Sequence, residues 1–179
     1  MTSFNPFEDR NARNIRNSLS GALVNSLDQM SPRPFRKTAT EWLKNHSIGI
    51  YSDFIHDRLS RYEDIFKTIH TDNIDDPVLQ AIQLWNCELF FECHDRLESV
   101  WQNSKGEMRK ALKGFIQAAG AYVHLENGNR RAAERLGKKA VRHLLNHGQA
   151  LPYVYNRKHL IESLEPLSPS PPRLRTSPQ

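Results

Sequence analysis

A histidine and a glutamate lie one turn apart in a strongly helical stretch, where they could transfer a proton or bind a metal ion. The stretch is residues 89–102, LFFECHDRLESVWQ. In a helix, one face of it consists of Phe90, Phe91, His94, Leu97, Glu98 and Trp101. Because these residues are mostly bulky and apolar, we predict that the face is buried. An unpaired buried carboxylate is costly, so Glu98 should bond to a side chain of the next helix.

Glu92 lies beside this face, with Glu88 and Asp95, on a flank that we interpret as an acidic ridge. The next helix, 107–126, carries the small residues Gly114, Ala118 and Ala121 on the side that also holds Gln117 and His124. Small residues allow another backbone to approach closely. If helix 89–102 packs there, Gln117 and His124 meet His94 and Glu98 in the interior.

Two interpretations of the polar cluster Glu92, His94, Glu98, Gln117 and His124 remain open. It is either a buried network that fixes the packing of two helices, or a site with a proton-transferring pair or a metal centre. We favour the network and expect no metal and no cofactor. The sequence assigns no catalytic residue.

A basic stripe is predicted on helix 129–146, where four cations recur at helical spacing: Arg131, Arg135, Lys138 and Arg142. Such a stripe is either a solvated face or a surface for anions or a protein partner. We expect a protein partner or a second copy of the chain more than nucleic acid, and no membrane. His143 and His147 also stand at metal-chelating spacing, but no carboxylate is near them in sequence.

Turn signals divide residues 76–147 into two helical hairpins. Asp76-Pro77 begins the first helix, the corner at 86–88 leads to helix 89–102, and Lys105-Gly106 ends it. Asn127-Gly128-Asn129 then separates helix 107–126 from helix 129–146, which ends at Gly148. The predicted fold is all-α, a compact helical bundle built around these hairpins.

The flanking regions have a different character. Residues 1–75 predict helices at 8–29, 35–46 and 53–70, the last capped by Asp53, which together form an extension packing on the core. Residues 148–179 predict a short helix at 156–165 and a tail that proline and serine should keep disordered and irrelevant to stability.

Composition limits the class of protein. Apolar residues make up 38% and charged residues 25%, which is polar but sufficient for one core in 179 residues. Neither a signal peptide nor a membrane-spanning run is visible, and Cys87 and Cys93 are not spaced to bridge. We therefore expect a cytoplasmic protein.

The motif residues resemble those of a known family. The run from Phe90 to Glu98, then Trp101, resembles the FFEAHE-x-LE-x-x-W segment of the bacterial domain of unknown function 309. Lys113 to Ala119, Tyr122-x-His124-Leu125 and Gly128-Asn129 resemble it too, so the likeness covers about residues 76–147. Cys93 and Asp95 depart from the family's alanine and glutamate, and Cys87-Glu88 replaces a corner that commonly contains glycine. The resemblance implies a small helical fold and no particular reaction.

These observations favour a helical module that packs or binds through its surfaces and is not an enzyme. One alternative is a metal-binding or hydrolase-like protein with a site at His94, Glu98 and His124. The other is a tetratricopeptide-like peptide binder, which the hairpin repeat suggests, although two hairpins are few for a solenoid.

Overall fold

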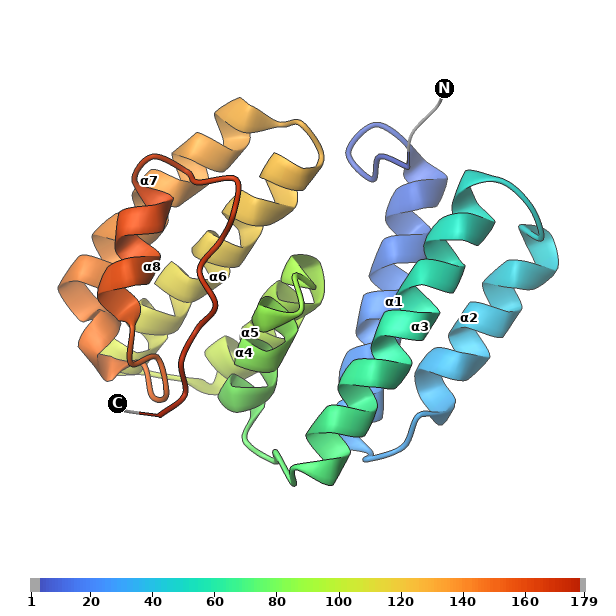
Figure 1. Cartoon of the computed structure of the whole chain (residues 1–179), viewed down its shortest axis with the longest axis horizontal. Coiled ribbons are helices and arrows are strands. Elements are labelled where there is room, and N and C mark those ends of the chain that lie inside the picture. Colours follow the sequence, from blue (N-terminus) through green and yellow to red (C-terminus); the bar gives the residue numbers. More distant parts are fainter. Residues whose placement is uncertain (1–3, 178–179) are drawn as a thin grey trace. The chain divides into compact units, whose positions relative to one another are not determined.

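The computed structural model describes residues 4–177 and is all-α, as the sequence predicted (Figure 1). This described part of the chain contains no β-strand. The helices are α1 (Arg10–Asp28), α2 (Arg33–Asn45), α3 (Ile50–Thr71), α4 (Pro77–Asn86), α5 (Phe90–Asn103), α6 (Gly106–Glu126), α7 (Arg130–His147) and α8 (Arg157–Leu164). A 3-10 turn, Gly148–Ala150, follows α7. The chain divides into two compact units between Ile74 and Asp75.

The first unit is formed by α1, α2 and α3, each of which packs on the other two. Its core is aliphatic along α1, where Ile15, Leu19 and Leu23 recur every four residues and are buried. Aromatic rings join the other helices, because Phe35 of α2 meets Tyr62 of α3 edge to face at 5.9 Å. Within residues 4–177, no helix has both the length and the apolar composition that crossing a bilayer requires.

The second unit contains the two predicted hairpins. Helix α4 packs on α5, α5 on α6, α6 on α7, and α7 on α8. The first hairpin begins as predicted, because the Asp76 carboxylate accepts hydrogen bonds from Val78 N at 2.8 Å and Leu79 N at 3.3 Å. The turn between α6 and α7 needs Gly128, whose φ of 73° lies in the left-handed region.

Aromatic rings from three helices form the centre of this unit. Trp85 of α4 lies 5.1 Å from Phe90 of α5, and 5.7 Å and 5.3 Å from Phe115 and Tyr122 of α6. Each of the four residues is at least 97% buried. Since such rings bury large apolar areas, this cluster dominates the packing of α4, α5 and α6.

At Gly114, one of the small residues of α6, the helix that packs closely is α7, whereas α5 was expected there. A Cβ atom on Gly114 would lie 2.9 Å from His143 Cβ and 3.2 Å from Leu144 Cγ, so the close approach at this position is by α7, not α5. Gly120 of α6 faces both neighbouring helices, because a Cβ there would lie 3.4 Å from Leu136 Cδ1 of α7 and 3.9 Å from His94 Cδ2 of α5. The prediction failed because glycine marks a close approach but does not identify the neighbour.

Two predicted helix ends also differ. Gly49, with a φ of 88°, precedes α3, so Asp53 lies in the first turn and is not the cap. Gly148 caps α7 with a φ of −62°, outside the left-handed region that a glycine cap usually adopts. Glycine is needed at position 148 because a side chain there would collide with Arg157. A Cβ there would lie 2.5 Å from Arg157 Cδ, and Arg157 donates to the Gly148 carbonyl oxygen at 2.8 Å.

We predict that Gly114→Ala destabilises the second unit by about 1–3 kcal/mol, because the new methyl group separates α6 from α7. Gly21→Ala is the matched control. A Cβ on Gly21, in the middle of α1, meets nothing within 4 Å. Alanine there should stabilise the helix by roughly 0.5–1 kcal/mol through its higher helix propensity. Thermal unfolding of both variants measures the two signs, and a Gly114→Ala protein that melts above the parent contradicts the close approach.

Candidate functional site

The buried face of α5 is rotated from the predicted one. Phe90, Cys93 and Leu97 point into the core, whereas the Glu98 side chain is 48% exposed. The prediction that Glu98 is buried and bonded to α6 is therefore wrong. It failed because Cys93 serves as a small apolar residue, which shifts the apolar stripe away from His94. Burial raises the pKa of the Cys93 thiol, with a further contribution from the charge of Glu92, so this thiol stays protonated and unreactive.

His94 lies at the edge of the core beside two carboxylates of its own helix. Its Nε2 atom is 3.8 Å from Glu98 Oε1, and its Nδ1 atom is 3.4 Å from Asp95 Oδ1. One ligand atom from each of these three residues lies within 4.8 Å of the others, a spacing that could hold a metal ion. Zinc sites usually take four ligands. These three come from a single helix and are partly exposed, so the group has the geometry of a surface ion-pair cluster as well.

Gln117 and His124 were expected to complete this cluster from α6. The Gln117 Oε1 atom is buried and has no hydrogen-bond partner, so it does not close a network with His94 and Glu98. The Nδ1 atom of His124 is also buried. The sealed four-residue network therefore does not form as predicted.

Three residues with charged or amide side chains are instead buried in the described part of this unit: Gln80, Glu92 and Arg96. Arg96 Nε donates to Gln80 Oε1 at 2.9 Å and so joins α5 to α4. Glu92, interpreted from the sequence as part of an acidic ridge on the flank of the helix and as a member of the polar cluster, is 1% exposed. Burial of a charged side chain is tolerated only when it is paired or hydrogen-bonded. In the sequence, Glu92 and Arg96 stand four positions apart, a helical spacing that places two side chains on the same side of a helix.

The basic stripe of α7 is exposed as predicted: Arg131, Arg135, Lys138 and Arg142. Glu134 lies among these residues and forms an ion pair with Arg130 at 3.0 Å. At the end of α7, His147 Nδ1 lies 2.6 Å from Glu107 Oε2 of α6, a carboxylate 40 positions away in sequence. Hydrogen bonds from Lys110 and His147 lower the pKa of Glu107. The sequence did not indicate the contact between His147 and Glu107, because the two residues lie 40 positions apart.

The C-terminal tail is not disordered up to residue 177, contrary to the prediction. After α8 it runs beside α6 and on to α4 (Figure 1). The Trp85 indole N–H donates to the Pro172 carbonyl oxygen at 2.9 Å. Leu167 and Leu174 are 2% and 3% exposed. The prediction considered how little apolar area the tail could bury alone, and could not include the surface that the helices provide.

Two asparagine side chains hold the main chain of the tail. Asn86 donates to the Leu174 carbonyl at 3.0 Å and accepts from the Leu174 N–H at 2.7 Å. Asn156 donates to the Arg173 carbonyl and accepts from the Arg175 N–H, both at 2.9 Å.

The backbone N–H of Tyr155 donates to the Arg175 carbonyl at 3.1 Å. Each of the four carbonyl groups from Pro172 to Arg175 thus accepts a hydrogen bond. We call the four residues that make these bonds the main-chain clamp: Trp85, Asn86, Tyr155 and Asn156.

Side chains of the clamped segment alternate between buried and exposed. Pro172 and Leu174 are buried, whereas Arg173 and Arg175 are exposed. This is the period of two that an extended chain gives. The arrangement combines hydrogen bonds to the main chain with an apolar surface for alternate side chains, which is how extended peptides are commonly recognised.

Sequence reasoning missed every member of the main-chain clamp. Asn86 was assigned only to the corner before helix 89–102. The available signal was weak. An asparagine at a helix end is ordinary, and only the location of the tail, nearly ninety residues later, shows what its amide binds.

Residues 78–136 match a family model described as a domain of unknown function, DUF309. This confirms the resemblance drawn from the motif residues and covers the segment from α4 into α7. No curated protein and no solved structure matches the chain. Trp85 and Asn86 lie inside the matched segment, whereas Tyr155, Asn156 and the tail lie beyond it.

We predict that Leu174→Asp destabilises the second unit by about 2–4 kcal/mol, because it places a carboxylate in the apolar surface that Leu174 occupies. Arg173→Asp is the matched control. The same residue is introduced one position earlier, on the exposed side of the extended chain, and should change stability by less than ~0.5 kcal/mol. Chemical denaturation of the two variants measures the difference, and equal midpoints would mean that the tail is not docked.

Proposed function

We propose that the DUF309-containing unit is a protein-interaction module that binds an extended, proline-containing segment by its main chain. In this chain the C-terminal tail occupies that site. The observation that supports the proposal most directly is the paired hydrogen bonding of Asn86 to both main-chain groups of Leu174. An amide side chain matches a peptide group because it offers one donor and one acceptor.

The hydrogen bonds of the main-chain clamp carry little sequence information, because every residue has the same backbone groups. Selectivity comes from the buried positions. Pro172 presents a carbonyl but no N–H, and Leu174 fills an apolar contact two residues later. The preferred segment is therefore Pro-x-Leu in extended conformation, with a polar or basic residue at the exposed positions. Proline favours this conformation before binding, which reduces the entropy lost.

A tail bound within the same chain would compete with a partner's segment. The tail follows α8 directly and is present at a high effective concentration, so a partner must bind more tightly or in larger amount. The module would accordingly be closed when the chain is alone and open to exchange when such a segment is supplied.

We expect that the tail can be exchanged once it is no longer covalently attached. A protease site replacing Pro169 and Ser170 lets the protein fold intact and then be cut. A fluorescent peptide of residues 168–177 should bind the cut protein saturably in an anisotropy titration. Asn86→Ala should weaken it about tenfold or more, since two main-chain groups lose their partner at ~1–3 kcal/mol each. Asn146→Ala, an exposed asparagine of α7, is the control and should bind as the parent does.

Three outcomes contradict the proposal. The labelled peptide does not bind a cut protein that retains its helical circular dichroism; Asn86→Ala and Asn146→Ala bind it equally; or the cut protein unfolds as the tail leaves. The last outcome would make the tail a structural part of the core and not an exchangeable ligand.

A further inference from the structure

The basic stripe of α7 lies on the side of the helix that is turned away from its packing partners. All four of its residues are exposed: Arg131, Arg135, Lys138 and Arg142. At 3.6 residues per turn, they fall within roughly 60° of the helix circumference. The buried residues of α7 fall on the opposite side: Ala133, Gly137, Ala140 and Leu144. The packing of α7 within its unit therefore leaves the stripe open.

Neighbouring carboxylates do not neutralise the stripe. None of its four side chains forms an ion pair or a hydrogen bond with a residue that the structure describes. Glu134, the acid among them, bonds to Arg130 instead, at 3.0 Å. Arg131 and Arg135 are four residues apart, as are Lys138 and Arg142. Like charges at this spacing repel each other and destabilise a helix, and an anionic partner would relieve that repulsion.

Positive charge continues from α7 onto α6. Burial lowers the pKa of His143, with further contributions from the charges of Lys113 and Arg142. Lys113 is exposed and belongs to α6, so cations of two adjacent helices act on the same point. The positive field is therefore a property of the hairpin that α6 and α7 form.

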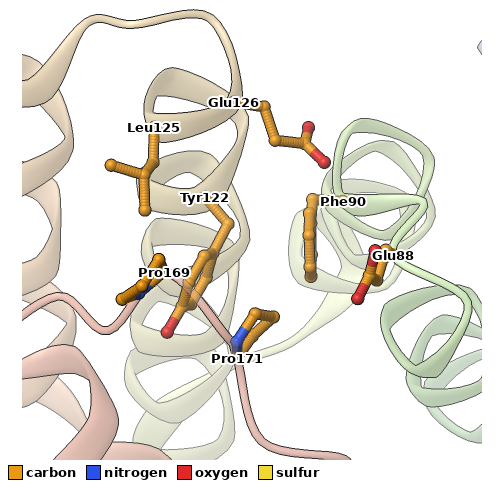
Figure 2. A pocket seen from close by; sticks show the side chains of 7 residues that line it. All are labelled: Glu88, Phe90, Tyr122, Leu125, Glu126, Pro169 and Pro171. Carbon is orange, nitrogen blue, oxygen red and sulfur yellow. The ribbon is translucent and has the colours of Figure 1, made fainter.

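Two hollows on the surface of the second unit differ in charge. Figure 2 shows the pocket beside the tail, where the charged residues are Glu88 and Glu126. Four residues line the hollow on α7: Arg131, Glu134, Arg135 and Lys138. Three of these are cations. A polyanion is therefore attracted to the hollow on α7 and repelled from the pocket beside the tail.

The lining of the α7 hollow favours a nucleic acid over a protein as the partner. The centre of a protein interface is mostly apolar, with aromatic and aliphatic side chains that fill pockets. In the described part of the chain, no apolar side chain lines this hollow. Contacts to phosphate groups require only charge and hydrogen-bond donors. From the sequence we expected a protein partner more than nucleic acid, and the lining supports the opposite choice.

The length of the basic stripe suits a sugar–phosphate backbone. From Arg131 to Arg142 the helix rises roughly 16 Å, at about 1.5 Å per residue. One strand of a duplex presents a phosphate about every 3.4 Å along the duplex axis, so the stripe extends along about five phosphates. Each of the four cations can therefore contact a different phosphate group.

We propose that α7 binds the phosphate backbone of a nucleic acid through the basic stripe, without reading the base sequence. Each residue of the stripe contacts one phosphate group, and Lys113 adds to the attraction from α6. Phosphate contacts alone carry no sequence information. This surface goes beyond the proposed function, because it uses neither the main-chain clamp nor the tail. Its test is independent of the peptide-exchange experiment.

The test is fluorescence anisotropy of the full-length protein with two labelled probes, a mixed-sequence DNA duplex and a single-stranded RNA, each about 20 nucleotides long and in low salt. We expect saturable binding of at least one probe. For the duplex, the logarithm of the binding constant should fall with the logarithm of salt concentration at a slope of about −3.6, since each neutralised phosphate contributes about −0.9. Tighter binding of the duplex or of the RNA identifies the form that is preferred, and both results support the proposal.

Variants distinguish the basic stripe from the net positive charge of the protein. Arg135→Gln combined with Lys138→Gln should weaken binding at least ~10-fold and halve the salt slope, because two phosphate contacts are lost. The pair also removes one member of each repelling pair, so the fold is retained. Arg33→Gln combined with Lys67→Gln is the control, since both are exposed cations of the first unit and the change in net charge is the same. It should leave the affinity and the slope unchanged.

Three results would overturn the proposal. Neither probe binds saturably; the two double variants bind equally well; or poly-L-glutamate displaces the duplex as effectively as unlabelled duplex of the same total charge. Poly-L-glutamate is the weaker competitor for a phosphate-binding surface, because an extended chain places its charges about 3.3–3.6 Å apart, against about 1.7 Å along a duplex. Equal competition would make an acidic protein the partner.

Discussion

One buried hydrogen-bond donor, the indole N–H of Trp85, connects helices α4, α5 and α6 with the C-terminal tail. Trp85 is 1% exposed at the centre of the ring cluster, so its indole N–H cannot reach water and needs an acceptor inside the protein. That acceptor is the carbonyl of Pro172, 87 positions later in the chain. Helices α4, α5 and α6 bring the rings together, but the segment after α8 satisfies the polar group that they bury. The docked tail therefore supplies an acceptor that helices α4, α5 and α6 do not provide for Trp85.

This constraint explains why an extended segment without regular structure is held so completely. Its main chain bonds to side-chain amides, its alternate side chains enter the apolar surface, and its earlier prolines close a pocket over Tyr122. The DUF309 match contains Trp85, Asn86, Phe90 and Tyr122, which form the receiving surface. The segment that it receives lies outside the match. The matched segment and the tail that docks on it are thus distinct parts of the chain, which is consistent with the proposed interaction module.

The sequence predicted the helices closely because local signals determine them. Asp76-Pro77 began α4 as expected, and Gly128 made the turn before α7. The candidate site was predicted less well, for physical reasons. Cys93 serves as a small apolar residue on the buried face of α5, so that face is rotated from the predicted one, with Glu98 exposed and Glu92 and Arg96 buried. Asn86 and Asn156 gain their role only from the tail, and no local pattern records a contact between such distant residues.

The central claim, that the tail's main chain is bound in the folded protein, is tested most directly by amide hydrogen exchange of the full-length chain, resolved by residue with NMR. The Leu174 and Arg175 amides donate to Asn86 and Asn156, so both should exchange more than ~100-fold slower than in an unstructured peptide. Their exchange should also depend on denaturant in the same way as core amides of α6. Exchange of both amides at the rate of an unstructured peptide would contradict the account, because a segment that opens freely cannot be the acceptor on which Trp85 depends.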